Sequence, residues 1–310
     1  MATRFEIVLH GENEMRLRAA AEEALDEIEN LERQLSIYRP DSELSRINRH
    51  AAREPVPVEP RLFVLLERAQ SISLQTNGAF DITSGPLSRC WGFMNGSGEL
   101  PGRKVLEAAR SVTGFELLEL KKESLSIRFK KSGTILDLGS IGKGYAIDRA
   151  IELLREAGIQ NAFLHGGTST SAALGTAPNG QPWRVAIEVP PDAEHSLAEK
   201  LLTAQCGRTL AVIELRDEAL SVSAVWGKAF EADGVVLGHI IDPRTGWPAR
   251  NSALTAAICN SATDSDAYST ALLVAKSSNE FLSADLIRRH LTCKYEHGKM
   301  SIYSQGIRIE

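Results

Sequence analysis

The chain has 310 residues, of which 43% are hydrophobic and 24% are charged, so it can bury a large core and is neither fibrous nor disordered. Its formal net charge is -5 and its basic residues are scattered among acids, which argues against a nucleic-acid partner. The four cysteines, Cys90, Cys206, Cys259 and Cys293, form no Cys-x-x-Cys pair, which argues against a zinc ribbon or a disulfide framework.

The start of the sequence bears on where the protein resides. It holds no charged-then-apolar leader and no lipid-acceptor cysteine, and no apolar run approaches the ~20 residues needed to span a bilayer. As written, the chain is therefore expected to be cytoplasmic and to lack a transmembrane segment. A mature fragment would look the same, so a periplasmic or cell-envelope location stays open.

Apolar periodicity defines the first elements. Alternation predicts a strand over 5–9, and the stripe from Leu17 to Leu35, spaced by three and four, predicts a long amphipathic helix. Alanines in that stripe favour packing on a sheet over coiled-coil pairing. The segment 38–48 contains proline and capping side chains, which predict a turn into a short helix, and 61–76 predicts a second amphipathic helix.

The central region combines loops and short strands. Residues 77–86 fit either a functional loop or a helix end followed by a connection, and 92–102 predicts a mobile surface loop. Strands are predicted over 125–129, 134–138, 162–165, 183–189, 209–215, 234–241 and 253–259, and helices over 145–157 and 264–275. Because these elements lack a strict β-α-β rhythm, the sequence favours an α+β fold with mixed or antiparallel sheets.

The Gly-rich run Asp137-Leu-Gly-Ser-Ile-Gly-Lys-Gly-Tyr-Ala-Ile-Asp148 joins an apolar segment to a helix. Free N–H groups and the positive end of the helix dipole at such a turn suit a phosphate or pyrophosphate, and Lys143 adds a cation. It is not a P-loop, because Gly144 follows the lysine, and its glycines lack dinucleotide-fold spacing. The run alone fits a tight structural turn equally well.

Three further segments carry candidate chemistry. Asp266 and Thr270 lie one turn apart on a predicted helix, which suits either Mg²⁺ or simple helix capping. His239 ends an apolar strand before Asp-Pro-x-x-Gly, where it could be a general base or a packing residue. The hydroxyls over 168–171 lack a Gly-x-Ser-x-Gly elbow, so a polar loop is the better interpretation.

Five segments in this order resemble the ApbE family, the flavin transferases that move FMN from FAD onto a threonine or serine of a target protein. They are Tyr38-Arg-Pro-Asp-Ser-Glu-Leu-Ser-Arg-Ile-Asn48, Gly78-Ala-Phe-Asp-Ile-Thr83, the Gly-rich run, His239-Ile-Ile-Asp-Pro-Arg-Thr-Gly246 and Asp266-Ala-Tyr-Ser-Thr270. The similarity runs over nearly the whole chain. It implies a T-fold-like flavin transferase domain over 1–310, either single or made of two intimately packed subdomains.

The resemblance also implies roles for individual positions. The residues implied to bind FAD are Met1, Tyr38, Ala79, Phe80, Asp81, Asp137 and Lys143. Ser140, Asp266 and Thr270 would form a Mg²⁺ site, and His239 corresponds to the family's candidate base. The implied reaction is transfer of FMN from FAD to a Ser/Thr hydroxyl of a target flavoprotein, with release of AMP.

The chain departs from the family pattern at two places. Thr168 replaces an acidic or amide residue, and Val222-Ser-Ala-Val-Trp226 replaces a Thr-Ser-Gly-x-Tyr run, although Ser223 is retained. These departures keep two alternatives open, a non-catalytic FAD-binding carrier and a metal-dependent FAD pyrophosphatase that yields FMN and AMP.

Overall fold

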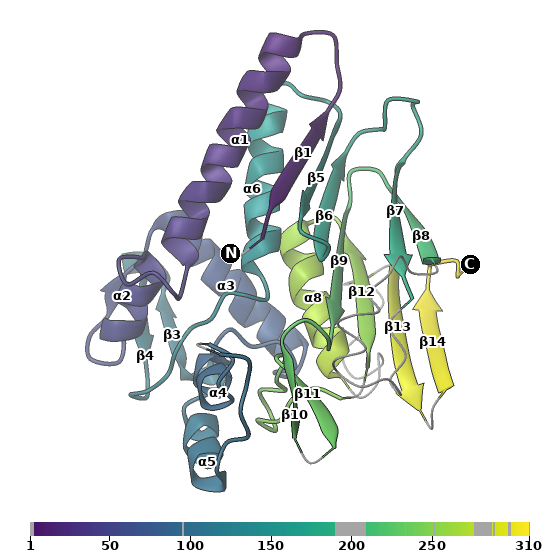
Figure 1. Cartoon of the computed structure of the whole chain (residues 1–310). Helices are drawn as coiled ribbons and strands as arrows, with labels where there is room; N and C mark the ends of the chain where they lie inside the picture. The colour runs from purple at the N-terminus through teal and green to yellow at the C-terminus, as the bar shows by residue number, and fades with distance from the viewer. Residues whose placement is uncertain are drawn as a thin grey trace.

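Seven antiparallel strands form the main sheet of the described chain, in the order β1-β5-β6-β9-β12-β13-β14 (Figure 1). The computed structural model describes residues 3–94, 96–189, 209–232, 234–250, 252–275, 287, 289–296 and 299–309. The strands are β1 (Phe5–Leu9), β5 (Ala162–Gly166), β6 (Thr170–Leu174), β9 (Ala219–Ala224), β12 (Leu254–Cys259), β13 (Arg289–Glu296) and β14 (Lys299–Gln305). The expected α+β class with antiparallel sheets is confirmed.

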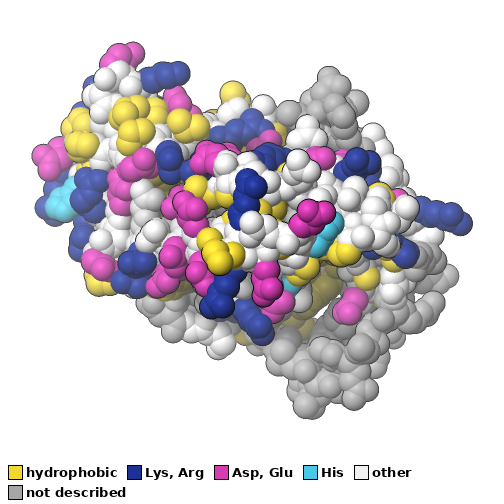
Figure 2. Space-filling view, turned by 90° about the horizontal axis from the view of Figure 1, so that it is seen from above, with side chains coloured by type: hydrophobic (Ala, Val, Ile, Leu, Met, Phe, Trp, Pro, Cys, Tyr) yellow, Lys and Arg dark blue, Asp and Glu magenta, His cyan; other side chains and the backbone are white. Residues whose placement is uncertain are grey.

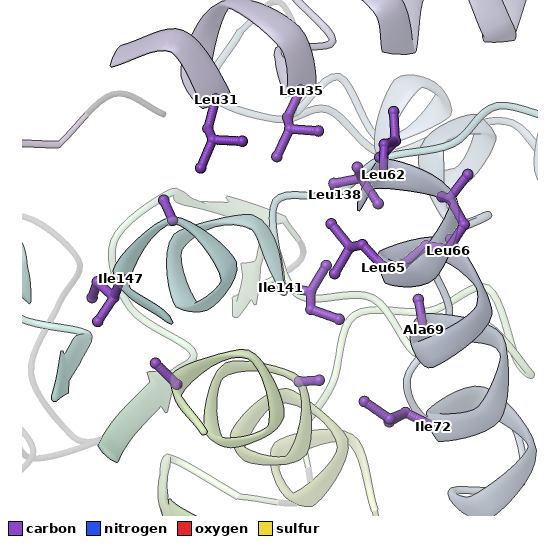
Figure 3. Packing of buried hydrophobic residues seen from close by; sticks show 14 of the residues in the cluster. Leu31, Leu35, Leu62, Leu65, Leu66, Ala69, Ile72, Leu138, Ile141 and Ile147 are labelled. Carbon is purple, nitrogen blue, oxygen red and sulfur yellow. The ribbon is translucent and has the colours of Figure 1, made fainter. Parts of the chain in front are cut away.

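Three helices cover one face of this sheet: α1 (Glu14–Leu35), α6 (Gly142–Glu156) and α8 (Ala262–Val274) (Figure 1). Helix α6 packs against both α1 and α8, and α3 (Pro60–Gln75) packs on α8. In Figure 3, Leu31 and Leu35 from α1, Leu65 from α3 and Ile141 before α6 point into a shared interior. The apolar stripe predicted for α1 therefore meets helices as well as the sheet.

The strands separate two cores because their side chains alternate between faces. On β12, Ala257 belongs to the helix-side core, whereas Leu254, Ala256 and Ile258 belong to the core on the other side. That second core is closed by a hairpin of β7 (Trp183–Glu188) and β8 (Thr209–Leu215), which supplies Ile187 and Ile213 among other residues. The central strands are thus buried on both faces.

A smaller lobe lies beside these layers (Figure 1). The short elements of this part of the molecule are α2 (Glu43–His50), β2 (Val56–Pro57), α4 (Gly85–Cys90), α5 (Arg103–Ser111), β3 (Leu118–Lys121), β4 (Ser126–Phe129), β10 (Ala229–Ala232) and β11 (Val235–Gly238). Trp91 is fully buried between α4 and the β10–β11 hairpin, where its ring packs near Phe230 at a centroid distance of 6.3 Å. Its Nε1 donates to the Gly246 carbonyl at 2.8 Å, which ties the lobe to the loop after β11.

Most predicted elements are confirmed, but the strand predicted over 134–138 is wrong. Residue Ile135 makes only an isolated bridge to Ser84, and the Asn48 side chain takes up both the N–H and the carbonyl of Leu136. At Leu136 a side-chain amide therefore takes the place of a neighbouring strand, and the Asp137 N–H donates to the Ile82 carbonyl at 2.7 Å. The segment 77–86 begins as the end of a helix, which is one of its two interpretations. The Gly78 N–H donates to the Ser73 carbonyl at 2.8 Å and so terminates α3.

Surface chemistry agrees with the mixed composition. On the face seen in Figure 2, basic and acidic side chains are interspersed rather than gathered into one patch of a single sign. Among the described residues, no helix combines the length and apolarity needed to cross a bilayer.

We predict that Leu154→Ala lowers the free energy of unfolding by about 2–5 kcal/mol, because Leu154 on α6 is fully buried in the helix-side core. Urea denaturation followed by circular dichroism would measure this loss. The control is Leu74→Ala on α3, where the side chain is 66% exposed and the expected change is within about 0.5 kcal/mol. Equal losses for the two variants would contradict the described core.

Candidate active site

The N-terminus of α6 is capped by a residue of another helix. The N-cap position is Ile141, whose side chain has no acceptor, so the first-turn N–H groups must find partners elsewhere. The N–H of Gly144 donates to Oδ2 of Asp266 on α8 at 3.1 Å. An acid at this end also complements the positive end of the helix dipole.

Glycine at position 144 allows the two helices to approach this closely. A Cβ added there would overlap the main-chain carbonyl of Ala262 and crowd the Thr263 nitrogen. By contrast, a Cβ at Gly142, one half-turn earlier, would meet only the Leu138 side chain at 4.0 Å. The second glycine of the Gly-Lys-Gly sequence is therefore a packing requirement of the α6–α8 contact.

Asp266 is the centre of a small polar cluster and is only 4% exposed. Its Oδ1 lies 3.4 Å from Nζ of Lys143 and accepts from the Thr170 hydroxyl at 3.3 Å. The Lys143 ammonium also donates to the Gly139 carbonyl at 3.4 Å, so it lies over the turn that precedes α6. The structure thus joins the predicted diphosphate-binding lysine to the predicted metal-binding acid.

Thr270 lies one turn further along α8. Its hydroxyl donates to the Asp266 carbonyl at 3.2 Å and lies 3.3 Å from the Ser223 hydroxyl on β9. Ser140 occupies the turn between Gly139 and the start of α6, next to the carbonyl that Lys143 contacts. The predicted metal residues thus come from α8 and from the turn before α6. The two helices pack against each other.

This donor set determines which ions the cluster suits. No group of three His, Cys, Asp or Glu side chains with metal-binding geometry occurs in the described ranges. A metal held here would take one carboxylate from Asp266 together with hydroxyl and main-chain oxygens. Such a sparse set of hard oxygen donors fits Mg²⁺, which retains waters and binds substrate phosphates, better than it fits zinc.

Helix α8 is held by polar contacts on two other sides. Arg68 of α3 makes a bidentate ion pair with Asp264, with nitrogen–oxygen distances of 2.8 and 2.7 Å. Toward the sheet, two hydroxyl pairs join β9 to α8: the buried pair Ser221 with Ser265 at 2.8 Å and the partly buried pair Ser223 with Ser269 at 2.9 Å. These contacts satisfy buried polar groups on a helix that is enclosed on nearly all sides.

His239 follows β11 directly, at the base of the β10–β11 hairpin. Both its main-chain N–H and its Nδ1 contact the carbonyl of Lys228, at 3.0 and 3.1 Å. A carbonyl can only accept, so Nδ1 carries the proton and the lone pair of Nε2 stays available. The ring also lies at 6.4 Å, edge to face, from Phe93 of the smaller lobe.

Electrostatics near His239 favours its neutral form. Burial lowers the pKa of His239, and the positive charges of Lys228 and Lys143 lower it further, against the hydrogen bond to the Lys228 carbonyl. Burial raises the pKa of Asp137, whose Oδ1 accepts from the Gly139 N–H at 2.9 Å, while that bond and Lys228 oppose the shift. His239, Lys143 and Asp137 therefore share one electrostatic environment.

The other predicted FAD residues divide into two groups. Tyr38 is 62% exposed, and partial burial raises the pKa of its phenol, as does the negative charge of Asp137. The side chains of Ala79 and Phe80 are 1% exposed and belong to the helix-side core. Only their main chain could line a pocket. Met1 lies outside the described residues.

Asp81 is buried and forms its own network. Its carboxylate accepts from the N–H and hydroxyl of Thr83 and from the Phe115 N–H, with distances of 2.7 to 2.8 Å. Burial raises its pKa to about 6 in spite of these bonds. Asp81 borders a cavity of about 520 Å³ with Arg110 and Arg244, and this cavity is not lined by Lys143, Asp266 or His239.

Sequence reasoning missed two residues of the cluster and assigned a third only to capping or packing. Thr170, at the start of β6, contacts Asp266. The pair of glycines shortly before Thr170 is the sequence signal that could have indicated this close contact. Lys228 acts on both His239 and Asp137, and no pattern in the sequence indicates it. Asp148 contacts the start of α8, which is distant in the chain and thus invisible to local patterns.

Comparisons with known proteins find relatives over most of the chain. The ApbE family matches residues 1–291 of the chain. The FAD:protein FMN transferase of Vibrio cholerae serotype O1 is 34% identical over 251 residues, which cover 80% of this chain and 70% of that protein. The protein of the same name from Escherichia coli K12 is 31% identical over 245 residues, which cover 77% of this chain and 66% of that protein.

Solved structures show the same likeness in three dimensions. The ApbE protein of Thermotoga maritima aligns with a TM-score of 0.82 at 27% identity, covering 96% of this chain and 93% of that one. The flavin transferase ApbE of Vibrio cholerae aligns with a TM-score of 0.81 at 28% identity, covering 99% of this chain and 94% of that one. The architecture is therefore shared across nearly the entire chain.

We predict that Gly144→Ala destabilises the protein by about 1–3 kcal/mol and weakens the site, because the added methyl group must push α8 away from α6. Gly142→Ala in the same first turn is the matched control and should be neutral or stabilising by up to about 1 kcal/mol. Thermal unfolding of the two variants would distinguish them. A Gly144→Ala protein as stable as Gly142→Ala would show that the close approach is not required.

Proposed function

Because the chain belongs to the ApbE family, we propose that it is an FAD:protein FMN transferase that moves FMN from FAD to a Ser/Thr hydroxyl of a target flavoprotein and releases AMP. The observation that carries the proposal is the contact between Lys143 at the α6 N-terminus and Asp266 on α8, with neutral His239 in the same electrostatic environment. One substrate with a diphosphate and a transferable phosphoryl group would account for the lysine, the acid and the histidine together.

The first requirement of the reaction is a site for the diphosphate of FAD. The first turn of α6 offers the positive end of the helix dipole, which suits phosphate oxygens. Lys143 adds a positive charge that is only 21% exposed and therefore weakly screened. This charge would neutralise part of the negative charge that develops on the leaving phosphate.

The proposal includes a magnesium ion held by Ser140, Asp266 and Thr270. Their carboxylate and hydroxyl oxygens are the hard donors that Mg²⁺ prefers, and water and substrate oxygens would complete its coordination shell. When bound, Mg²⁺ would supply Lewis-acid stabilisation of charge on the diphosphate. Lys143, which lies beside Oδ1 of Asp266 in the structure, would turn toward the phosphates.

The second requirement is a base for the acceptor hydroxyl. Nε2 of His239 has its lone pair free, because Nδ1 donates to the Lys228 carbonyl, and its lowered pKa keeps the ring neutral near pH 7. His239 would remove the proton of the threonine or serine hydroxyl. The hydroxyl oxygen then attacks the FMN phosphorus, the bond from that phosphorus to the AMP oxygen breaks, and a phosphoester joins FMN to the target.

Within the departing segment Val222–Trp226, Ser223 and Val222 lie on opposite faces of the sheet. Ser223, the retained member of the Val222–Trp226 segment, contacts both Ser269 and Thr270 on α8. Val222, where the family has threonine, packs with the second core on the opposite face of the sheet. The changed residue therefore lies away from the metal-binding hydroxyls.

The direct test incubates the protein with FAD, Mg²⁺ and a protein fragment that bears a Ser/Thr-Gly-Ala-Thr-like acceptor. We expect in-gel flavin fluorescence on the fragment and stoichiometric AMP, with loss of both on chelation of the metal. Asp266→Ala should lower the rate about 100-fold or more, since Lewis-acid stabilisation is worth several kcal/mol.

Product analysis separates the alternatives. AMP and free FMN formed equally with and without acceptor would indicate an FAD pyrophosphatase, and tight FAD binding without AMP release would indicate a carrier. Either result in a folded, FAD-bound sample would contradict the proposed transfer. Leu154→Ala provides the control for a general loss of stability, because Leu154 belongs to the apolar core and not to the polar cluster.

The pH dependence tests the role of His239. A base must be unprotonated, so transfer is expected above the pKa of His239 and is lost as the pH falls through it. That pKa lies below the ordinary value of 6.5, so activity should persist into mildly acid solution. His239→Asn should lower the rate about 100-fold or more.

Lys228 provides a sharper version of the same test. Lys228→Met removes a positive charge that lowers the pKa of His239, so the acid limb of the pH–rate profile should move to higher pH. Lys228→Arg retains the positive charge and the main-chain carbonyl, so the acid limb of its pH–rate profile should lie at the same pH as in the wild type. A near-normal rate for His239→Asn, or identical limbs for both Lys228 variants, would contradict the assignment of His239 as the base.

A further inference from the structure

Asp148 on α6 binds the beginning of α8. Its Oδ1 accepts from the Ala262 N–H at 2.7 Å. Its Oδ2 accepts from the Thr263 N–H at 2.8 Å, from the Thr263 hydroxyl at 2.5 Å and from the Ser261 hydroxyl at 2.8 Å. One carboxylate therefore takes four hydrogen bonds from three consecutive residues at the N-terminus of a neighbouring helix.

This contact and the Gly144–Asp266 contact are reciprocal. Gly144 and Asp148 are four residues apart on α6, and Ala262 and Asp266 are four residues apart on α8, so each pair lies on one face of its helix. Each helix thus places a carboxylate at the N-terminus of the other. The two contacts, one turn apart, fix both the rotation and the translation of α8 relative to α6.

The N-terminus of α8 is capped without Asp148. Ser261 is the N-cap residue, and its hydroxyl accepts from the Asp264 N–H at 3.2 Å. The helix can therefore form with its own cap, and the Arg68–Asp264 ion pair and the hydroxyl pairs to β9 would still hold it. What Asp148 adds is a link between the start of α8 and the helix that carries Lys143.

We infer that Asp148 is a positioning residue for the reaction: by anchoring the first turn of α8 on α6, it holds Asp266 and Thr270 at the N-terminus of α6 beside Lys143. The inference rests on the proposed function for its chemical meaning. Asp148 itself touches neither FAD nor metal in this assignment. Its effect passes through the position of two oxygen donors.

The surroundings of Asp148 support a positioning role over a separate ligand site. Asp148 borders a cavity of about 230 Å³ with Glu152 and Glu218, but both of its oxygens are engaged by α8. Burial raises its pKa, and the four hydrogen bonds from α8 oppose this shift by favouring the carboxylate. The carboxylate is therefore committed to the helix.

The variant Asp148→Asn tests the inference with little change in volume. Its amide must present an N–H group to at least one of the α8 donors, and it removes the negative charge at the helix N-terminus. Calorimetric titration with Mg²⁺ would be made on the protein alone and with ADP, a diphosphate that has no flavin to transfer. We expect the Kd for Mg²⁺ to rise about tenfold or more, as is typical when a supporting contact of a metal ligand is lost.

Transfer kinetics give an independent measure. The Mg²⁺ concentration for half-maximal transfer should rise with the Kd, and saturating Mg²⁺ should recover part of the rate. Leu154→Ala, on the same helix but in the apolar core, is the control: it should lower the melting temperature and leave the Mg²⁺ affinity unchanged. Thr263→Val, which removes one of the four hydrogen bonds, should shift the Kd in the same direction by a smaller factor and serves if Asp148→Asn does not fold.

Four outcomes decide the matter. Wild-type Mg²⁺ affinity in a folded Asp148→Asn or Thr263→Val protein would overturn the inference, as would equal losses of affinity in Leu154→Ala. A wild-type protein that binds no Mg²⁺ in either titration would overturn both the metal site and the inference. Mg²⁺ binding that weakens in Asp148→Asn, combined with no flavinylated product from the wild type, would contradict the proposed transfer and leave the role of Asp148 standing.

Discussion

The mutual capping of α6 and α8 is the constraint on which the arrangement of the polar cluster depends. Asp266 accepts from the Gly144 N–H, and Asp148 accepts from the Ala262 and Thr263 N–H groups. Unpaired N–H groups buried at a helix start are costly, so each helix gains from holding the other in one place. The same contacts bring an acid and a lysine together at the end of a helix dipole.

Asp266 therefore has two physical roles that need not conflict. One oxygen accepts from the main chain of α6, while the other faces Lys143 and Thr170. A carboxylate has lone pairs enough for a hydrogen bond and a metal ion together. Its position depends on the glycine at 144, because any larger residue would separate the helices before the hydrogen bond could form.

Much of this could be predicted from the sequence where the information is local. The glycines predicted a turn into a helix, the Asp266–Thr270 spacing placed both residues on one helix face, and the helix predicted over 264–275 is observed as Ala262–Val274. The strand predicted over 134–138 was wrong because both main-chain groups of Leu136 bond to the Asn48 side chain, which no periodicity encodes.

Contacts between distant segments were not predictable in the same way. Asp148 was compatible with capping or packing in the sequence, and only the fold shows which helix it caps. Lys228 precedes β10 and His239 follows β11, so the two residues meet only because these strands pair. The β6 strand was missed at Thr170–Leu174, because its small and hydroxylated residues resemble a polar loop until the neighbouring strands bury them.

The reciprocal caps also have a consequence for biosynthesis. Asp148 and its partners at Ala262 and Thr263 are separated by more than a hundred positions in the chain, with several strands of the sheet between them. While the ribosome is still making those strands, α6 is complete but its first turn has no carboxylate to receive the Gly144 N–H. Lys143 and Asp266 can thus come together at the start of α6 only after α8 has been synthesised, long after α6 itself.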